Sequence, residues 1–144
     1  MNFNKLTQGE KIVVVAGVLL ILDLALLPWH RFQGTVLGTR VDVARAGIES
    51  PNGGYGVFAV LLTLVMVLQV VASRFTKAQL PQPAVGWPRV HLYVGAGVAI
   101  VVLLKLFAET DALSIGAYLG ILLAGAVWYG GFLISRAANA PGYP

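Results

Sequence analysis

Four long apolar runs occupy most of the chain, and each is long enough to cross a lipid bilayer as a helix. They predict helices over residues 8–27, 55–73, 90–108 and 112–134. A helix rises about 1.5 Å per residue, so about twenty residues span a hydrocarbon core of roughly 30 Å. Backbone groups in lipid must pair within the protein, which leaves helices or a closed barrel, and continuous apolar runs exclude the alternating strands of a barrel. The pattern therefore predicts an all-α membrane protein, with one four-helix transmembrane bundle over residues 1–144.

Local sequence signals mark both ends of the first helix. Thr7 and Glu10 have the spacing of a capping box, in which each side chain accepts from the backbone N–H of the other residue. Pro28 disfavours helical geometry at Leu27, so the helix should end there. Asp23 interrupts the apolar run and no small-residue cleavage site follows it, so we interpret the segment as an uncleaved helix and not as a signal peptide.

The two longer connections between the predicted helices differ in character. In the outer loop, residues 29–54, β-branched residues alternate with Arg40 and Asp42, which is a strand pattern. This alternation predicts a short β-hairpin lying on the outer end of the bundle, and an irregular loop is the alternative that the pattern leaves open. The inner loop, residues 74–89, contains three prolines and is predicted to be a stiff, extended linker.

The composition supports a membrane protein and removes several kinds of chemistry. Hydrophobic residues make up 58% of the chain and charged residues 11%, against about 25% charged in soluble domains. The absence of cysteine excludes disulfides, thiol catalysis and cysteine-based metal sites. The net charge is +4, but the basic residues flank the apolar runs. We therefore expect them to meet the head groups of the lipid bilayer, and we expect no nucleic-acid partner.

The distribution of basic residues predicts the orientation. An even number of crossings places both termini on one side, which carries six lysines and arginines against three on the other. The six are Lys5, Lys11, Arg74, Lys77, Arg89 and Arg136, and the three are Arg31, Arg40 and Arg45. Because cytoplasmic loops carry the excess of basic residues, we expect a multi-pass protein of a bacterial inner membrane with both termini in the cytoplasm.

The motifs of common active sites are missing from the sequence. It has no glycine-rich phosphate loop, no nucleophile elbow and no zinc-binding H-E-x-x-H. His30 and His91 fall on opposite sides of the membrane in the predicted topology, so they cannot share a metal or a haem. We therefore predict no catalytic residues, no metal and no cofactor.

Small residues follow one another at four-residue spacing in the last two predicted helices. Gly116, Gly120 and Ala124 form such a set in the fourth helix, and Gly95 and Ala99 in the third. Small residues at this spacing let two helix backbones approach closely in lipid. Two interpretations stay open: the set joins helices three and four within the chain, or it docks a partner subunit.

Two ionisable residues, Asp23 and Lys105, lie inside apolar runs. Charges within a membrane are costly and suggest a functional or structural pair. Their predicted depths below the outer membrane boundary match, so we predict an ion pair, on the assumption that helices one and three are adjacent. In the alternative, Lys105 extends to the outer head groups and Asp23 is protonated or hydrated.

Several segments together resemble a loosely defined group of small four-helix membrane proteins of high-GC Gram-positive bacteria. They are the opening Lys5-Leu6-Thr7-Gln8-Gly9-Glu10-Lys11-Ile12, the Leu27-Pro28-Trp29 that closes the first helix, Lys105 late in the third helix, and the glycine-rich fourth helix. The resemblance implies four helices over most of the chain, and it implies no particular activity.

The scarcity of catalytic groups favours a non-enzymatic accessory or scaffold subunit of a larger inner-membrane complex. Its partner would be another membrane protein or further copies of the chain, and Arg31, Arg40 and Asp42 of the outer loop are available for contact. Two other functions remain open. One is a small-solute or ion transporter or channel lined by Asp23 and Lys105, and the other is a lipid-acting membrane enzyme that uses Asp23 or the outer-loop charges.

Overall fold

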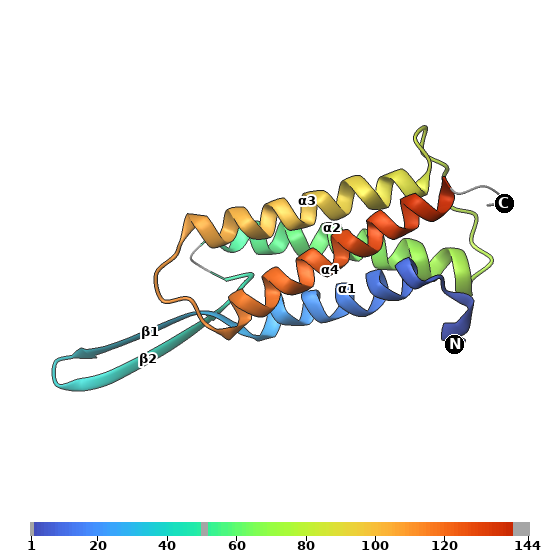
Figure 1. The fold of residues 1–144 in the computed structure, drawn as a ribbon. Helices are drawn as coiled ribbons and strands as arrows, with labels where there is room; N and C mark the ends of the chain where they lie inside the picture. The colour runs from blue at the N-terminus through green and yellow to red at the C-terminus, as the bar shows by residue number, and fades with distance from the viewer. Residues whose placement is uncertain (1, 50–51, 140–144) are drawn as a thin grey trace.

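The computed structural model describes residues 2–49 and 52–139. In these residues it contains four long helices, a short 3-10 helix and a two-stranded antiparallel sheet. The elements are η1 (Phe3–Lys5), α1 (Gln8–Leu26), β1 (Pro28–Val36), β2 (Thr39–Ala46), α2 (Gly53–Phe75), α3 (Trp87–Ala108) and α4 (Ile115–Ala138). The helices lie side by side, and the β1–β2 hairpin extends beyond one end of them (Figure 1). We call that end the outer end, and the end with η1 and the last turn of α4 the inner end.

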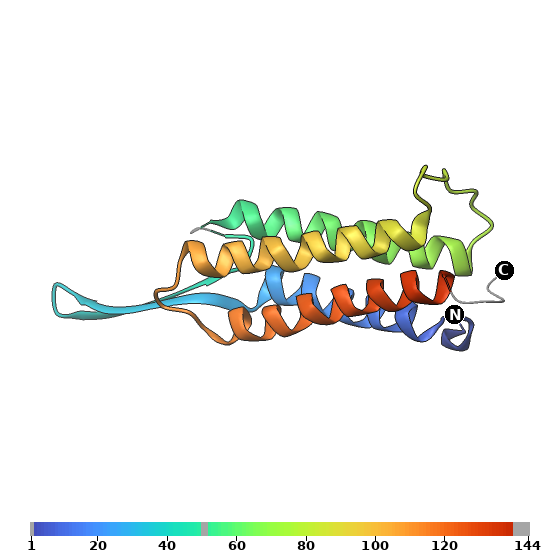
Figure 2. The ribbon, with the colours of Figure 1, turned by 45° about the horizontal axis from the view of Figure 1, so that its top comes forward.

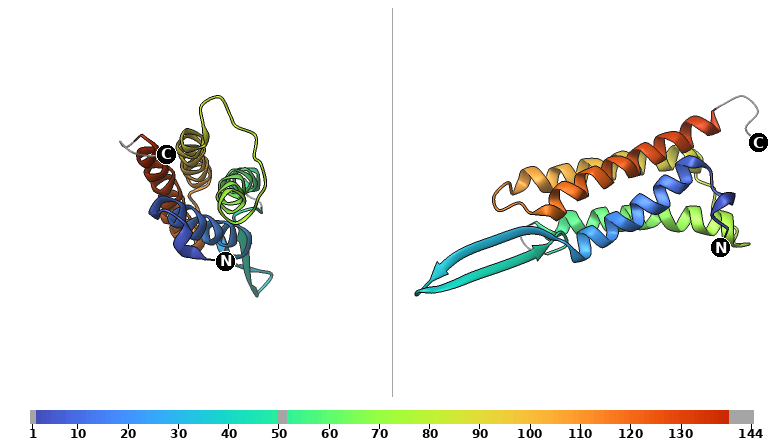
Figure 3. Two further views of the ribbon diagram at one scale, coloured as in Figure 1. Left: turned by 90° about the vertical axis from the view of Figure 1, so that its right-hand side faces the viewer. Right: turned by 60° about the horizontal axis from the view of Figure 1, so that its bottom comes forward.

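The four helices form a ring in chain order. α1 packs against α2 and α4, and α3 packs against the same two helices. Seen along the bundle, α1 and α3 therefore occupy opposite corners (Figure 3). The assumption that helices one and three are neighbours is wrong.

Three helices, α2, α3 and α4, are long and apolar enough to cross a membrane. This supports the prediction of a membrane protein. α1 is not among the three, since its 19 residues include the charged Glu10, Lys11 and Asp23. The structure thus shows four helices but three candidate spans where the sequence predicts four.

The helix ends follow the local signals to different degrees. The capping box is confirmed, because Thr7 Oγ1 accepts from the N–H of Glu10 at 3.3 Å and Glu10 Oε2 accepts from the N–H of Thr7 at 2.8 Å. α1 ends at Leu26, one residue earlier than predicted. α2 is two residues longer at each end than the predicted 55–73, and α3 begins at Trp87 instead of residue 90. Pro88 does not prevent that earlier start, because the first helical turn needs no N–H donor there.

Of the four helices, α4 differs most from its predicted bounds. The helix begins at Ile115 instead of residue 112 and continues to Ala138 instead of residue 134. Ala112 has a φ of 56°, in the left-handed region, so the helix cannot begin there. The segment instead pairs with β1, because the N–H of Arg31 donates to Ala112 O and the N–H of Ser114 donates to Trp29 O, both at 2.8 Å.

The predicted hairpin is present, but it extends away from the bundle and does not lie on its outer end (Figures 1 and 2). Its two-residue turn is Leu37–Gly38, with φ of 50° and 81°, the signs that a type I′ hairpin turn requires. Val36 pairs with Thr39 across the turn. Of β1, only Pro28, Trp29 and His30 are buried or half-buried, so the rest of the strand is exposed.

Candidate functional site at the inner end of the bundle

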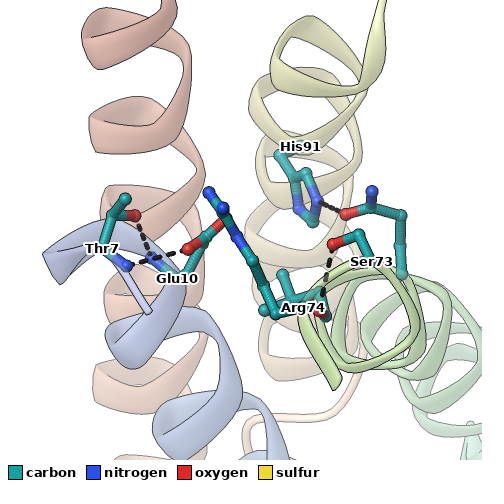
Figure 4. A network of polar contacts seen from close by, with 7 residues as sticks. Thr7, Glu10, Ser73, Arg74 and His91 are labelled. Atoms are coloured by element: carbon teal, nitrogen blue, oxygen red, sulfur yellow. Dashed lines mark hydrogen bonds and ion pairs between the residues drawn. The ribbon is translucent and has the colours of Figure 1, made fainter. Parts of the chain in front are cut away.

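Polar side chains from three helices meet at the inner end. The first turn of α1 supplies Glu10, the last turns of α2 supply Gln69, Ser73 and Arg74, and the first turns of α3 supply His91 (Figure 4). The antiparallel order of the helices brings these segments to one level. We call these five residues the inner polar cluster.

An ion pair between Glu10 and Arg74 joins α1 to α2. Arg74 Nε donates to Glu10 Oε1 at 2.9 Å, and Arg74 Nη2 lies 2.9 Å from the same oxygen. The second carboxylate oxygen of Glu10 accepts from the backbone of Thr7 in the capping box. Glu10 is 8% exposed. A charge this well buried needs such partners, so the pair and the cap stabilise each other.

His91 is the most buried member of the cluster. It is 2% exposed, and its Nε2 lies 2.6 Å from Gln69 Oε1. Its other ring nitrogen, Nδ1, is buried and has no hydrogen-bond partner within the described ranges. Ser73 Oγ, close by, donates to Val70 O at 3.0 Å and keeps its acceptor capacity.

A cavity of about 210 Å³ lies among these side chains. Its lining consists of Glu10, Gln69, Ser73, Arg74, Trp87, Pro88, His91 and Ile134. A second cavity, of about 360 Å³, lies between the inner loop and the helices and shares Gln69, Ser73 and Trp87 with the first. The Trp87 indole N–H donates to Pro81 O at 3.1 Å, which ties the loop to the start of α3. We call the first cavity the inner pocket.

The outer end of the bundle is closed around Trp29. Its side chain is fully buried, and its indole N–H donates to Asp23 Oδ2 at 2.9 Å. Lys105 Nζ lies 5.4 Å from the centre of a Trp29 ring and donates to Asn52 O at 3.3 Å. Asp23 and Lys105 are each only 1% exposed. The Lys105 ammonium is therefore enclosed by protein atoms at the outer end.

Asp23 and Lys105 share one neighbour, although their helices occupy opposite corners of the bundle. The ion pairs within the described ranges join Arg31 to Asp42 and Arg74 to Glu10. Asp23 and Lys105 instead both contact Trp29, while Asp23 Oδ1 is buried without a hydrogen-bond partner in the described part of the chain. A direct ion pair between them stays a prediction.

The predicted small-residue set of α4 is buried inside the chain. A Cβ on Gly116 would lie 2.7 Å from Pro28 O, and one on Gly120 would lie 2.7 Å from Asp23 Oδ2 and overlap the Trp29 ring. Ala124 is 2% exposed. The first two residues thus pack against the end of α1 and the start of β1, which neither interpretation anticipated.

In α3, the two predicted small residues have different surroundings. A Cβ on Gly95 would lie 3.1 Å from the Cα of Trp128, so this glycine allows α3 and α4 to approach closely. Ala99 is half-buried and lines an apolar cavity of about 180 Å³ together with Ala124 and Trp128.

The outer-loop charges lie on the hairpin. Arg31 donates to both oxygens of Asp42, with the shortest distance, 2.7 Å, from Nη2. These hydrogen bonds lower the pKa of Asp42 below its usual 3.8 and raise that of Arg31. Arg40 is exposed and pairs in register with Thr35.

The two histidines lie at opposite ends of the bundle. His30 is fully buried at the outer end, where its Nδ1 lies 3.3 Å from Asp111 O. Within residues 2–49 and 52–139, no three His, Cys, Asp or Glu residues are grouped so that they could hold a metal ion.

The inner polar cluster was not predicted as a site, although the sequence contains a signal for it. Glu10, Arg74 and His91 all fall near the inner side of the predicted topology, and Gln69 is a rare polar residue in an apolar run. Each residue had an ordinary explanation by itself, as a helix cap, a flanking charge or an interfacial side chain. Only the ring order of the helices brings them together.

No family model matches the chain, and no curated protein or solved structure matches it either.

Proposed function

We propose that the chain is a non-enzymatic subunit of a membrane complex and that its hairpin docks on a partner membrane protein. The two faces of the hairpin differ in character. Phe32, Val36, Val41 and Val43 share one face by register, and Gln33, Thr35, Arg40 and Asp42 share the other. Leu37, at the tip, is fully exposed. This uncovered apolar face is the observation that carries the proposal, since an isolated two-stranded hairpin is marginally stable in water without a packing partner.

A fourth membrane crossing by α1 is part of the proposal. Its buried face contains Glu10 and Asp23 and, apart from Gln8 in the first turn, its exposed side chains are apolar. These exposed residues are Val15, Val18, Leu19, Leu22 and Leu26. The surface that α1 presents to its surroundings therefore suits lipid, although its sequence contains three charged residues. With four crossings and the excess of basic residues at the inner end, we propose a bacterial inner membrane and cytoplasmic termini.

The interior of the bundle argues against a transporter or channel. Between the two polar ends, the large buried side chains of the four helices are apolar: Leu20, Met66, Val98 and Val127. Thr63 is buried there too, but its hydroxyl donates to Ala59 O at 2.8 Å. A solute path would need polar groups along its length.

A pair of hairpin variants tests the proposal. Val36→Glu places a charge on the apolar face, and Thr35→Glu places the same charge on the polar face one residue away. Native mass measurement after gentle detergent extraction should show a stoichiometric membrane-protein partner with the unmodified chain and with Thr35→Glu, and loss of that partner with Val36→Glu. A chain that is extracted alone, or as a homo-oligomer unaffected by Val36→Glu, would contradict the proposal.

A further inference from the structure

The inner pocket is lined by groups that can both accept and donate hydrogen bonds, and the proposed docking of the hairpin uses none of them. The pocket lies at the end of the bundle opposite the hairpin, so its role can be separated from that of the hairpin experimentally. Its volume of about 210 Å³ exceeds the roughly 30 Å³ of one water several-fold.

His91 lines the pocket and carries an acceptor without a hydrogen-bond partner in the described part of the chain. A neutral imidazole has one protonated and one unprotonated nitrogen. Because Gln69 Oε1 can only accept, Nε2 of His91 carries the proton, and the partnerless Nδ1 presents a lone pair. A buried acceptor of this kind costs free energy unless a donor meets it. The occupant should therefore carry an O–H or N–H group.

Arg74, which lines the same pocket, supplies unused donors. A guanidinium has five N–H donors, and the hydrogen bonds from Nε and Nη2 to Glu10 leave others available. The Arg74 side chain is 36% exposed, so an anion can reach it. Arginine binds phosphate through paired N–H donors.

The charge around the pocket also favours an anion. The inner end carries five further basic side chains: Lys5, Lys11, Lys77, Arg89 and Arg136. Trp87 lines the pocket at the start of α3, where an amphipathic ring suits the level of lipid head groups. Basic pockets at the ends of membrane helices bind anionic head groups by this combination of charge and hydrogen bonding.

We propose that the inner pocket binds a phosphoester that carries a free hydroxyl, as the head group of phosphatidylglycerol does. The phosphate would accept from Arg74, and the hydroxyl would donate to Nδ1 of His91. A choline head group has a phosphate but no donor for His91, so it should not fit. The same chemistry occurs in soluble glycerol phosphate, and the experiment must separate the two sources.

The two histidines make a direct test available in the full chain. In detergent, ¹⁵N-histidine labelling gives NMR signals from His91 in the pocket and from His30 at the opposite end, which serves as an internal control. Short-chain phosphatidylglycerol should shift the Nδ1 resonance of His91 saturably and leave His30 unchanged, while phosphatidylcholine with the same acyl chains should shift neither. An equal response to glycerol phosphate would keep the phosphoester chemistry but overturn the lipid source. No response of His91 to either phosphoester would overturn the proposal and leave water as the occupant.

The affinity for phosphatidylglycerol can also be compared between two variants. Arg74→Gln should weaken phosphatidylglycerol binding about tenfold or more, because a charge-assisted hydrogen bond is lost. Lys77→Gln removes a neighbouring basic residue that does not line the pocket and should change binding much less. Thermal unfolding without lipid checks that both variants fold. Equal weakening by both would indicate general attraction to the basic surface and would contradict a specific pocket.

Discussion

Trp29 organises the outer end of the bundle although it lies outside every predicted helix. Its indole lies beside two buried charged residues, since Asp23 accepts from its N–H and the Lys105 ammonium lies near its ring. Gly120 and Gly47 leave room for it, because a Cβ on either would come close to the indole.

Trp29→Phe should therefore destabilise the protein more than an ordinary tryptophan substitution. It removes the donor to a buried carboxylate, which costs about 1–3 kcal/mol. Trp87→Phe is a matched control, because the indole hydrogen bond that it removes is exposed, and it should cost less than about 0.5 kcal/mol. Thermal unfolding in detergent compares the two, and equal melting temperatures would refute the role given to Trp29.

Substitution by alanine should have different effects on stability at two glycines of α4. Gly120→Ala pushes a methyl group into Trp29 and Asp23 and should cost about 1–3 kcal/mol. Gly125→Ala places the methyl group in open space and should leave stability unchanged or raise it slightly, since alanine favours helices. Circular dichroism melts of both variants decide the point. If Gly120→Ala and Gly125→Ala have the same melting temperature, the close packing of Gly120 against Trp29 is not present.

For single residues, the position of a side chain along its helix could be predicted from the sequence better than the neighbours that it contacts. The depth of Asp23 and Lys105 along their helices follows from a fixed rise per residue, and both are buried near the outer end. Which neighbour each side chain meets depends on the order of the helices around the bundle, which one sequence does not contain. For the same reason, the contact of Glu10 with Arg74 could not be predicted, since the two residues are separated by 64 positions.

Among the elements, the hairpin was predicted from the alternation of residue types alone. Its direction relative to the bundle could not be predicted in this way. Period-two spacing sets which residues share a face. Whether the hairpin lies on the bundle or extends from it depends on the pairing of Arg31 and Trp29 with residues 112 and 114, for which the sequence has no recognisable signal. Because residues 112 and 114 take part in this pairing, α4 begins only at Ile115.

Acid should loosen the hairpin. The folded-state pKa of Asp42 is lowered by its hydrogen bonds with Arg31, so the stabilisation from the pair is complete above the usual pKa of 3.8 and is lost as pH falls below it. Cross-strand NOEs between Gln33 and Asp42 should be unchanged from pH 7 to about 5 and weaken below about 3.5.

The Asp42→Asn variant is the control for that titration. It has no carboxyl to protonate at this position, so its cross-strand NOEs should not weaken in acid through this pair. A variant that loses them over the same pH range as the unmodified chain would show that another group controls the hairpin.

At the scale of the whole molecule, the number of helices that cross the membrane decides on which side each connection lies. The chain has no cysteine, so single cysteines report position cleanly. We predict that an impermeant maleimide added to intact cells labels a cysteine at Thr39, at the outer end, and does not label one at Gln82, in the inner loop. Labelling at Gln82 alone would reverse the orientation, and labelling at both would show that the two ends lie on the same side and that the helices do not cross as proposed.

The exposed part of the hairpin also sets a geometric condition on any partner. Six residues of β1, Arg31 to Val36, are exposed, and at about 3.3 Å per residue they reach roughly 20 Å. The head-group layer on one side of a bilayer is only about 5–8 Å thick. With the base of the hairpin at the edge of the hydrocarbon, Leu37 stands more than about 10 Å above the lipid surface. In the proposed orientation, a partner that contacts Leu37 would therefore need a folded domain outside the membrane.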